Sequence, residues 1–589
     1  MDGGERIARV LERHGVRHLF TLCGGHISPI LVGAKGRGIR VVDVRDEASA
    51  VFAADAAARL TGIPGVAAVT AGPGVTNALT ALQNARMAES PVVVFGGATA
   101  TVLKGRGALQ DIDQVALVAP AVKATFVATR VHDLPRLVEE AFATARGGVP
   151  GPVFVEVPVD LLYREELVRA WYGGRRGGGV AGWALRRYLG WHVDRLFRGA
   201  GAAAGELAEL APAPPPELPE PQPSDVRRAA RRLAGARRPV LLVGAQAMTG
   251  TGSGAGSDLA AGELAAAVAA LGVPTYLTSS SRGLLGPDSD LQVRHRRRQA
   301  LREADLVILA GVPADFRLDY GRQIGRRAEI VAANLSPAEM RRNRKPDLAV
   351  EAHPGRFLAA LAARFERRAS VRERWHRWRD SLAERDRERD EEIAALAAEP
   401  VDGVNPIALC QEIDRVMGGD AVIVADGGDF VATAAYVVRP RGPLGWLDPG
   451  AFGTLGVGGG FAVGAALCRP ASEVWLLWGD GAAGFSLAEL DTCARHGLPV
   501  IAVVGNDGGW AQIEREQVEV LGDAVGTELA RCEYHRVAEG YGAAGLVVAR
   551  PEEVAPALAR AQEIAAAGRP VLINVLVGRT AFRKGSISM

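Results

Sequence analysis

Two apolar runs near the C-terminus end in acidic turns, and their spacing restricts how this part of the chain folds. Residues 473–478 stop at Gly479-Asp480-Gly481, and residues 499–504 stop at Gly505-Asn506-Asp507-Gly508-Gly509. The intervening residues 485–497 predict an amphipathic helix that ends at a glycine. Parallel strands joined by such a crossover helix place both carboxyl ends at one edge of a sheet. Asp480 and Asp507 are therefore expected to share a crevice lined by glycines, whose backbone a ligand can approach.

Two carboxylates beside a glycine-rich turn suit Mg²⁺ that holds a diphosphate. This cation takes few carboxylates from a protein and completes its coordination with phosphate oxygens and water. A lone GDG usually marks an ordinary turn, so the specificity lies in the full strand–helix–strand pattern.

Composition indicates a soluble globular protein with several domains. The 589 residues suffice for roughly three to four domains, and 48% of them are hydrophobic and 23% charged. A net charge of +2 argues against a dedicated nucleic-acid binder. The five cysteines are odd in number and lack metal-type spacing, which favours reduced thiols. No signal-peptide core and no transmembrane segment is expected, so the predicted location is cytoplasmic.

Alternation of short apolar strands with helices predicts an α/β protein with three doubly wound parallel-sheet domains. The first domain is expected at 1–165, the second, smaller one at 224–355 and the third at 405–589. Strands are predicted at 40–44, 66–70, 91–95, 153–157, 239–244, 273–277, 305–311, 329–334 and 421–425, and from residues 474, 500 and 571.

Two segments between these domains break the alternation. Residues 166–223 form an insert and linker that includes a basic amphipathic helix at 183–197. This helix could lie on a membrane surface, although docking on a neighbouring domain or subunit is favoured. Residues 356–404 are expected to form a charged helical connector whose solvated face carries ion pairs.

The acidic strand ends resemble the GDG…NN cofactor motif of thiamine-diphosphate (ThDP) enzymes. Asp480 matches the aspartate of that motif, and Asn506-Asp507 matches its asparagine pair. The resemblance implies Mg²⁺ bound by Asp480, by Asp507 or Asn506, and by the carbonyl of Gly509. Aspartate in place of the second asparagine adds a negative charge and leaves the division of labour between Asn506 and Asp507 open. The order of the three domains matches the acetolactate-synthase-like branch: pyrimidine-binding, middle and diphosphate-binding.

Further segments match the places where this family binds its cofactor. Glu47 corresponds to the catalytic acid that contacts the aminopyrimidine, although an acid at a helix N-terminus also stabilises the helix dipole. Segment 71–78 resembles a GPG-x-x-N motif beside the pyrimidine. The other cofactor-binding residues that the resemblance implies are Gly72, Asn77, Gly427, Gly428, Asp429, Phe430, Gly453, Leu455, Gly481 and Ala482. Among these, Leu455 replaces the methionine that bends the cofactor.

Within the family, the chain looks most like the 2-hydroxyacyl-CoA lyases, which are related to oxalyl-CoA decarboxylases. The implied reaction cleaves a 2-hydroxyacyl-CoA to an aldehyde and formyl-CoA, or runs in the condensing direction. His26 is the candidate proton shuttle, because imidazole titrates near neutrality, and the alternative is a structural histidine. Gln110 is the candidate hydrogen-bond donor to the developing alkoxide, with Asp111 as a weaker candidate nearby.

The resemblance leaves several alternatives open. Residues 294–298 contain four arginines that suit the phosphates of CoA, but they also fit a solvated basic turn. Acetolactate synthase, which condenses two pyruvates, and a non-catalytic ThDP-fold regulatory subunit are the rival functions. The substrate is expected to be an acyl-CoA or a 2-keto acid, and a nucleotide (ADP or FAD) is allowed for in the middle domain. Family members join their pyrimidine and diphosphate sites across subunits, which implies a homodimer or homotetramer.

Overall fold

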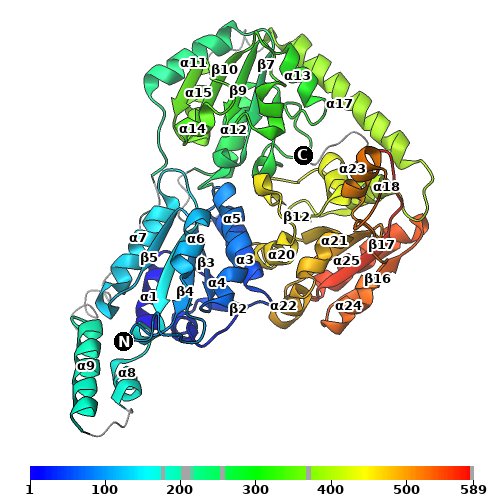
Figure 1. Cartoon of the computed structure of the whole chain (residues 1–589). Helices are drawn as coiled ribbons and strands as arrows, with labels where there is room; N and C mark the ends of the chain where they lie inside the picture. Colours follow the sequence, from blue (N-terminus) through cyan, green and yellow to red (C-terminus); the bar gives the residue numbers. More distant parts are fainter. Residues whose placement is uncertain (174–178, 201–213, 215–216, 252–258, 366–372, 584–589) are drawn as a thin grey trace. The chain divides into compact units, whose positions relative to one another are not determined.

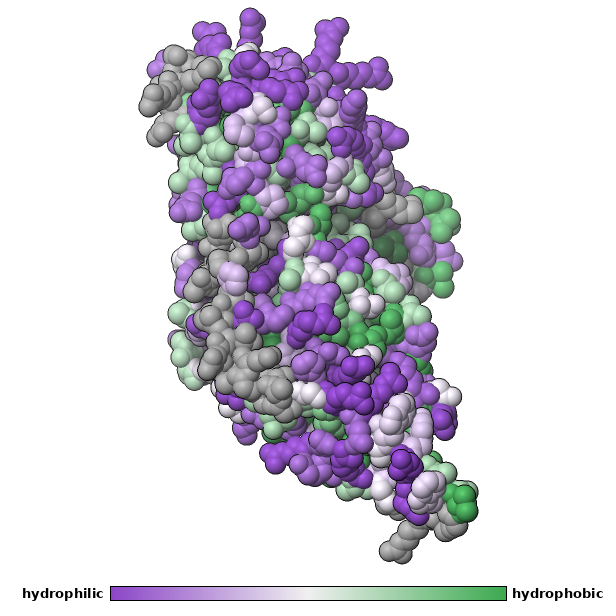
Figure 2. Space-filling model, turned by 90° about the vertical axis from the view of Figure 1, so that its left-hand side faces the viewer, coloured by the Kyte–Doolittle hydropathy of each residue, from purple (hydrophilic) through white to green (hydrophobic). Residues whose placement is uncertain are grey.

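The structure, a computed structural model, describes residues 1–173, 179–200, 214, 217–251, 259–365 and 373–583 (Figure 1). The chain divides into two compact units. The first contains Met1–Ala58 and Ile63–Pro216, and the second contains Arg59–Gly62 and Glu217–Met589. In the face seen in Figure 2, hydrophilic residues cover most of the surface and hydrophobic residues are scattered among them.

The N-terminal unit is built on a six-stranded sheet of order β2-β1-β3-β4-β6-β5, in which all neighbouring strands are parallel. The strands are β1 (His18–Thr21), β2 (Arg40–Asp43), β3 (Gly65–Val69), β4 (Val92–Ala98), β5 (Ala124–Val127) and β6 (Val153–Pro158). The helices are α1 (Gly3–Arg13), α2 (Ser28–Gly36), α3 (Glu47–Thr61), α4 (Pro73–Asn77), α5 (Leu79–Met87), α6 (Gln114–Val118), α7 (Leu134–Arg146), α8 (Glu165–Gly173) and α9 (Gly179–Phe197).

The second unit contains two more parallel sheets. The five-stranded sheet has the order β11-β10-β9-β7-β8, and the six-stranded sheet has the order β13-β12-β14-β15-β17-β16. The strands are β7 (Pro239–Val243), β8 (Thr275–Leu277), β9 (Leu306–Ala310), β10 (Glu329–Asn334), β11 (Leu348–Glu351), β12 (Val422–Asp426), β13 (Trp446–Leu447), β14 (Val474–Gly479), β15 (Val500–Asn506), β16 (Ala544–Val548) and β17 (Val571–Leu576).

Helices lie on both sides of each sheet, so the prediction of an α/β protein with three parallel sheets is confirmed. The helices of the second unit are α11 (Pro223–Gly235), α12 (Ala261–Leu271), α13 (Arg297–Glu303), α14 (Pro337–Met340), α15 (Pro354–Phe365), α17 (His376–Ala397), α18 (Pro406–Val416), α19 (Asp429–Val437), α20 (Val457–Cys468), α21 (Asp480–Ser486), α22 (Glu489–His496), α23 (Ala511–Leu521), α24 (Tyr534–Gly540) and α25 (Val554–Ala566). The central strands β4, β7, β9, β12 and β15 are buried along their whole length, as expected for parallel strands covered on two faces.

The single crossover helix predicted at 485–497 is wrong in its extent. Helix α21 begins at Asp480, directly after β14, and α22 follows it after a short break. The early start is favoured because the Asp480 carboxylate accepts the N–H of Gly481 at 2.8 Å, and an acid stabilises the positive end of a helix dipole. The predicted glycine stop is present, with Gly497 in the left-handed conformation at φ 64°.

The charged connector is only partly solvated. In α17, Trp378 and Leu382 are buried in the core of the middle domain. The Asp386 carboxylate accepts the backbone N–H groups of Arg294 at 2.7 Å and His295 at 2.9 Å. This helix therefore also fixes the turn that carries the arginine run.

Candidate active site

The carboxyl ends of β12 and β14 meet where the order of the third sheet reverses, which is the usual position of a ligand in an open α/β sheet. Gly427 has a φ of 144°, and a Cβ placed there would lie 2.6 Å from the backbone nitrogen of Gly479. The turns that follow the two strands are thus in direct backbone contact. Helices α19 and α21 begin immediately after these turns, at Asp429 and Asp480, so the predicted residues Gly428, Phe430, Gly481 and Ala482 lie at two helix N-termini that favour an anion.

Two acids lie together at this edge. Asp480 is 3% exposed and accepts the N–H groups of Gly481 and, at 2.9 Å, Gly508. Burial raises the pKa of Asp480. Burial and the neighbouring charge of Asp480 raise the pKa of Asp507 to about 7. Like charges repel in a poorly solvated site, and a bound divalent cation would relieve this repulsion.

The side chain of Asn506 makes different hydrogen bonds from that of Asp507. Its side-chain amide donates to the carbonyl of Cys532 at 3.1 Å and to the side chain of Asn574 at 3.1 Å. Gly509 continues the turn, and its N–H donates to the Asp507 carboxylate at 3.2 Å. In the part of the chain that the structure describes, no group of three or more His, Cys, Asp or Glu side chains could hold a metal ion. The two acids therefore fit a cation that takes its remaining ligands from phosphate, backbone and water.

Glycines at this edge are required by the aromatic rings packed on them. A Cβ at Gly481 would lie 2.5 Å from the Trp510 ring, and one at Gly505 would lie 2.5 Å from the Phe430 ring. Both arrangements bring a ring onto the backbone of a strand end or of the helix start that follows it. The hydroxyl of Tyr534 donates to the carbonyl of Asp480 at 3.1 Å, which fixes the same turn from another helix.

Asp429 faces a cavity beside the two acids. Arg515 in α23 binds its carboxylate with two hydrogen bonds, of 3.0 and 2.8 Å. The cavity has a volume of about 360 Å³ and is lined in part by Asp429, Phe430, Asp507, Arg515 and Arg579. Arg515 was not predicted from the sequence, because its partner is 86 residues away.

The turn predicted to bend the cofactor is held by an acid that sequence reasoning did not assign. Gly453 is in the left-handed conformation at φ 65°, and Leu455 follows it half-buried. Asp426, at the end of β12, accepts the N–H groups of Gly456 at 3.1 Å and Gly458 at 2.8 Å. The indole N–H of Trp478 also donates to this carboxylate, at 3.1 Å. Burial raises the pKa of Asp426 to about 6.

In the N-terminal unit, Glu47 is the first residue of α3 and is 5% exposed. The side-chain amide of Asn77 donates to its carboxylate at 3.0 Å. Gly74 also lies against this carboxylate, because a Cβ at that position would be 3.2 Å from the Glu47 oxygen. The acid and the GPG-x-x-N segment, which lie some thirty residues apart in the sequence, are thus neighbours in the fold.

His26 and Gln110 lie near the strand ends of the same unit. The Nδ1 atom of His26 is 3.3 Å from the hydroxyl of Thr70, just after β3, and burial lowers the pKa of His26. Gln110 has a positive φ of 62°, and its backbone packs against Gly72. Gln114, which the sequence analysis did not select, accepts the N–H of Gly72 at 3.3 Å and donates to the carbonyl of Gly97 at 2.8 Å.

Asp111 has a local role in this loop. Its carboxylate accepts the N–H of Gly105 at 2.5 Å, which closes the loop that carries Gln110. The structure therefore gives Asp111 a contact within the loop.

Comparison with known proteins agrees with this geometry. Residues 1–117 match the thiamine pyrophosphate enzyme N-terminal TPP binding domain, residues 226–361 match the central domain, and residues 426–575 match the C-terminal TPP binding domain. The chain is 47% identical to 2-hydroxyacyl-CoA lyase 2 of Danio rerio, over all of this chain and 93% of the relative. It is 46% identical to the protein of the same name in Homo sapiens, over all of this chain and 92% of the relative. It is 34% identical to the acetolactate synthase large subunit IlvG of Mycobacterium tuberculosis, over 98% of this chain and 96% of the relative.

Two matched domains bind thiamine pyrophosphate, which is ThDP, and they contain the two groups of residues described above. The chain therefore belongs to the thiamine pyrophosphate enzyme family, in the branch that contains the 2-hydroxyacyl-CoA lyases and the acetolactate synthases.

Proposed function

We propose that the protein is a ThDP-dependent lyase that cleaves a 2-hydroxyacyl-CoA to an aldehyde and formyl-CoA, or catalyses the reverse condensation. The similarity to lyases of that name over the whole chain supports the reaction class. The observation that carries the choice of a CoA substrate is an arginine-lined cavity in the second unit, with a volume of about 500 Å³. It lies where residues 276–298 meet residues 435–440.

Two arginines of this cavity suit a bound anion. Arg282 donates to the carbonyl of Ala435 at 2.7 Å, and Arg297 donates to the carbonyl of Arg317 at 2.6 Å. Burial lowers the pKa of both guanidinium groups. Within the described residues, neither forms an ion pair with a carboxylate. A carbonyl does not neutralise a guanidinium, so the phosphates of CoA would supply the missing charge.

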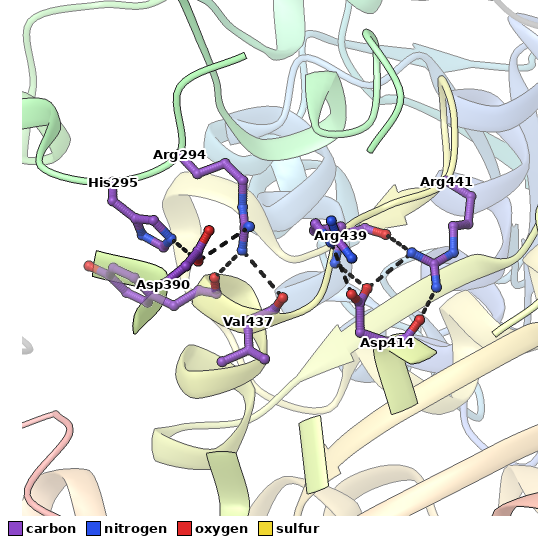
Figure 3. A network of polar contacts seen from close by, with 8 residues as sticks. Arg294, His295, Asp390, Asp414, Val437, Arg439 and Arg441 are labelled. Carbon is purple, nitrogen blue, oxygen red and sulfur yellow. Dashed lines mark hydrogen bonds and ion pairs between the residues drawn. The ribbon is translucent and has the colours of Figure 1, made fainter. Parts of the chain in front are cut away.

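Other arginines at the cavity are already committed to the protein. Arg294 donates to the carbonyls of Tyr436 at 2.6 Å and Val437 at 3.3 Å, and it lies 3.6 Å from Asp390 (Figure 3). Arg439 and Arg441 both bind the carboxylate of Asp414. The contacts of Arg294 with Tyr436 and Val437 join the middle domain to the C-terminal domain, and the pairing of Arg439 with Asp414 lies within the C-terminal domain.

In the proposed site, Asp480, Asp507 and the carbonyl of Gly509 hold Mg²⁺. The amide nitrogen of Asn506 serves the fold, because it donates to Cys532 and Asn574, whereas the buried side-chain oxygen of Asn506 has no hydrogen-bond partner among the described residues and is the alternative metal ligand. The turns at 427–430 and 481–482 receive the diphosphate, while Gly453 and Leu455 shape the bend. Glu47, held by Asn77, contacts the aminopyrimidine, and Gly72 lies beside it. When bound, ThDP supplies the carbon nucleophile and the electron sink of the reaction.

We assign proton transfer to His26. The lowered pKa keeps its imidazole neutral at pH 7, so that it can accept the proton of the 2-hydroxyl group. The side chain of Gln110 donates a hydrogen bond to the oxygen on which negative charge develops. Because Glu47 and the acids at the third sheet belong to different units, we propose a homodimer or homotetramer in which subunits share active sites.

The direct test is to incubate the protein, ThDP and Mg²⁺ with a 2-hydroxyacyl-CoA or with pyruvate. Aldehyde and formyl-CoA from the first substrate are expected. Formation of acetolactate from pyruvate, without cleavage of the acyl-CoA, would contradict the proposal and favour an acetolactate synthase. The 34% identity to an acetolactate synthase large subunit is the observation that supports this alternative. A flavin spectrum of the purified protein would likewise favour that alternative and place FAD, and not ADP, in the middle domain.

The cavity has its own test. Replacing Arg297 by glutamine removes one half-buried cation from the cavity wall, and we expect KM for the acyl-CoA to rise about tenfold while kcat changes little. Arg302→Gln, on the exposed side of the same helix α13, is the matched control. An unchanged KM in the Arg297 variant would show that CoA binds elsewhere.

A further inference from the structure

Helices α8 and α9 form a pair that is fixed to its own sheet by buried polar contacts. Asp160, which follows β6 and is fully buried, accepts the hydroxyl of Tyr172 in α8 at 2.7 Å. It also accepts the N–H and the hydroxyl of Thr101, at 3.0 and 2.6 Å. The Thr101 hydroxyl also lies 2.7 Å from the Nε2 atom of His192 in α9. The orientation of the pair is therefore set by the fold.

One face of α9 packs on the unit, and the opposite face is exposed. Leu189, Val193, Leu196 and Phe197 are buried at helical spacing. In Figure 1, α8 and α9 lie side by side and extend away from the sheet of their unit. The exposed apolar and aromatic side chains of the pair are Leu167, Trp171, Val180, Trp183, Leu185, Tyr188 and Trp191, and the exposed fraction reaches 83% for Val180 and 58% for Trp183.

The exposed face of α9 is also basic. Arg187 and Arg195 are exposed on this face, and Arg198, which directly follows α9, is also exposed. The guanidinium of Arg187 lies over the Trp183 ring, 6.0 Å from its centroid. The one acid among the described residues of α9, Asp194, is paired with Arg169 of α8 at 2.6 Å. The face therefore mixes indole and phenol rings with a surplus of positive charge.

We propose that this exposed face of α8 and α9, called the aromatic–arginine face below, binds the surface of a membrane that contains anionic lipids. Tryptophan and tyrosine have an apolar ring with a polar group and prefer the boundary between lipid and water. Arginines on the same face attract anionic headgroups and keep the helix parallel to the surface. The pair would bind as a peripheral anchor.

A second copy of the chain fits this face less well. A two-fold contact brings the same surface of both copies together, so the positively charged face of one copy would meet the positively charged face of the other. Such like-charge contacts are unfavourable, whereas an anionic headgroup layer is complementary in charge. The charge of the face therefore favours lipid over self-association.

Vesicle co-sedimentation tests the proposal with the full-length protein. We expect binding to phosphatidylcholine vesicles that contain phosphatidylserine, and little binding to pure phosphatidylcholine. Increasing salt should weaken the binding. Arg187→Gln and Arg195→Gln should each weaken it roughly fivefold, since each basic residue near the surface contributes about that factor. The double variant Trp183→Ser/Trp191→Ser should remove it.

The controls separate this effect from misfolding and from assembly. Val32→Ser changes another exposed apolar residue of the same unit, on α2, and should leave vesicle binding unchanged. Circular dichroism and light scattering should show the same fold and the same oligomeric state for all variants. If the tryptophan double variant changes the oligomeric state, or if the wild type binds neutral and anionic vesicles equally, the proposal is wrong. Lyase activity in solution does not depend on membrane binding. A failure of the lyase proposal and a failure of the membrane proposal can therefore be told apart.

Discussion

Replacing Glu47 by glutamine separates the charge of this acid from its contacts. Glutamine keeps the size of the side chain and can still receive the hydrogen bond of Asn77. Its amide could not exchange a proton with the ring nitrogen of the aminopyrimidine, as a carboxyl group would, so we expect kcat to fall by a factor of about 10² to 10⁴ while ThDP still binds. Turnover of the acyl-CoA and calorimetric binding of ThDP are the two measurements.

The matched control is Asp46→Asn, which changes the preceding carboxylate. Asp46 is exposed and accepts the N–H of Ala48 at 2.7 Å, a contact that asparagine retains. Near-normal activity is expected. Equal activity of the Glu47 variant and the wild type would remove the assigned role of Glu47.

The protonation of Asp426 is expected to make the stability of the folded protein depend on pH. Its carboxyl holds a proton up to about pH 6 in the folded protein, against 3.8 for an ordinary aspartate. The folded state thus binds more protons between these values, and the stability falls as the pH rises through this window. The loss of stability due to Asp426 amounts to roughly 3 kcal/mol. It begins near pH 4 and is complete above about pH 6.

Asp426→Asn should remove the part of this slope that Asp426 contributes. Relative to the wild type, the free energy of unfolding of the variant should therefore rise between pH 4 and pH 6. The variant should also bind ThDP more weakly, because one amide oxygen cannot accept all three N–H groups from Gly456, Gly458 and Trp478. Urea unfolding followed by tryptophan fluorescence, and ThDP titration, measure the two effects. Parallel pH curves for the two proteins would show that Asp426 does not titrate in this range.

At the scale of elements, the backbone contact between the turns after β12 and β14 makes Gly427 irreplaceable. Alanine at this position would have to adopt a φ of 144° with its Cβ 2.6 Å from the Gly479 nitrogen. We expect a loss of at least about 2 kcal/mol of stability, together with loss of ThDP binding. Gly484→Ala is the control, because this position inside α21 has open space around it. Thermal unfolding distinguishes the variants, and equal melting temperatures would contradict the steric argument.

Interior elements and strand-end motifs could be predicted from the sequence, because continuous apolar runs and glycine–acid turns are local signals. The edge strands β5 and β16 were not predicted, because each has only four or five residues, and so short an apolar segment can equally belong to a loop or a helix. The roles of Asp426, Gln114 and Arg515 could not be predicted from the sequence either. Each acts on backbone or side chains tens of residues away, and only the folded sheet brings these partners together.

At the scale of the whole molecule, the proposed sharing of active sites between subunits can be tested with two inactive variants. Glu47→Gln damages the pyrimidine side of the site, and Asp480→Asn damages the metal side. If one subunit supplies Glu47 and its partner supplies Asp480, a mixed dimer has one intact site and one doubly altered site. Purified mixed dimers should therefore recover about half of the wild-type activity, whereas an unpurified random mixture, in which about half of the dimers are mixed, should recover about a quarter. Co-expression with different affinity tags and assay of the doubly purified dimers measures this recovery, whereas each variant alone should remain inactive. Sites built within single chains would stay inactive in every mixture, because each would still carry one of the two substitutions.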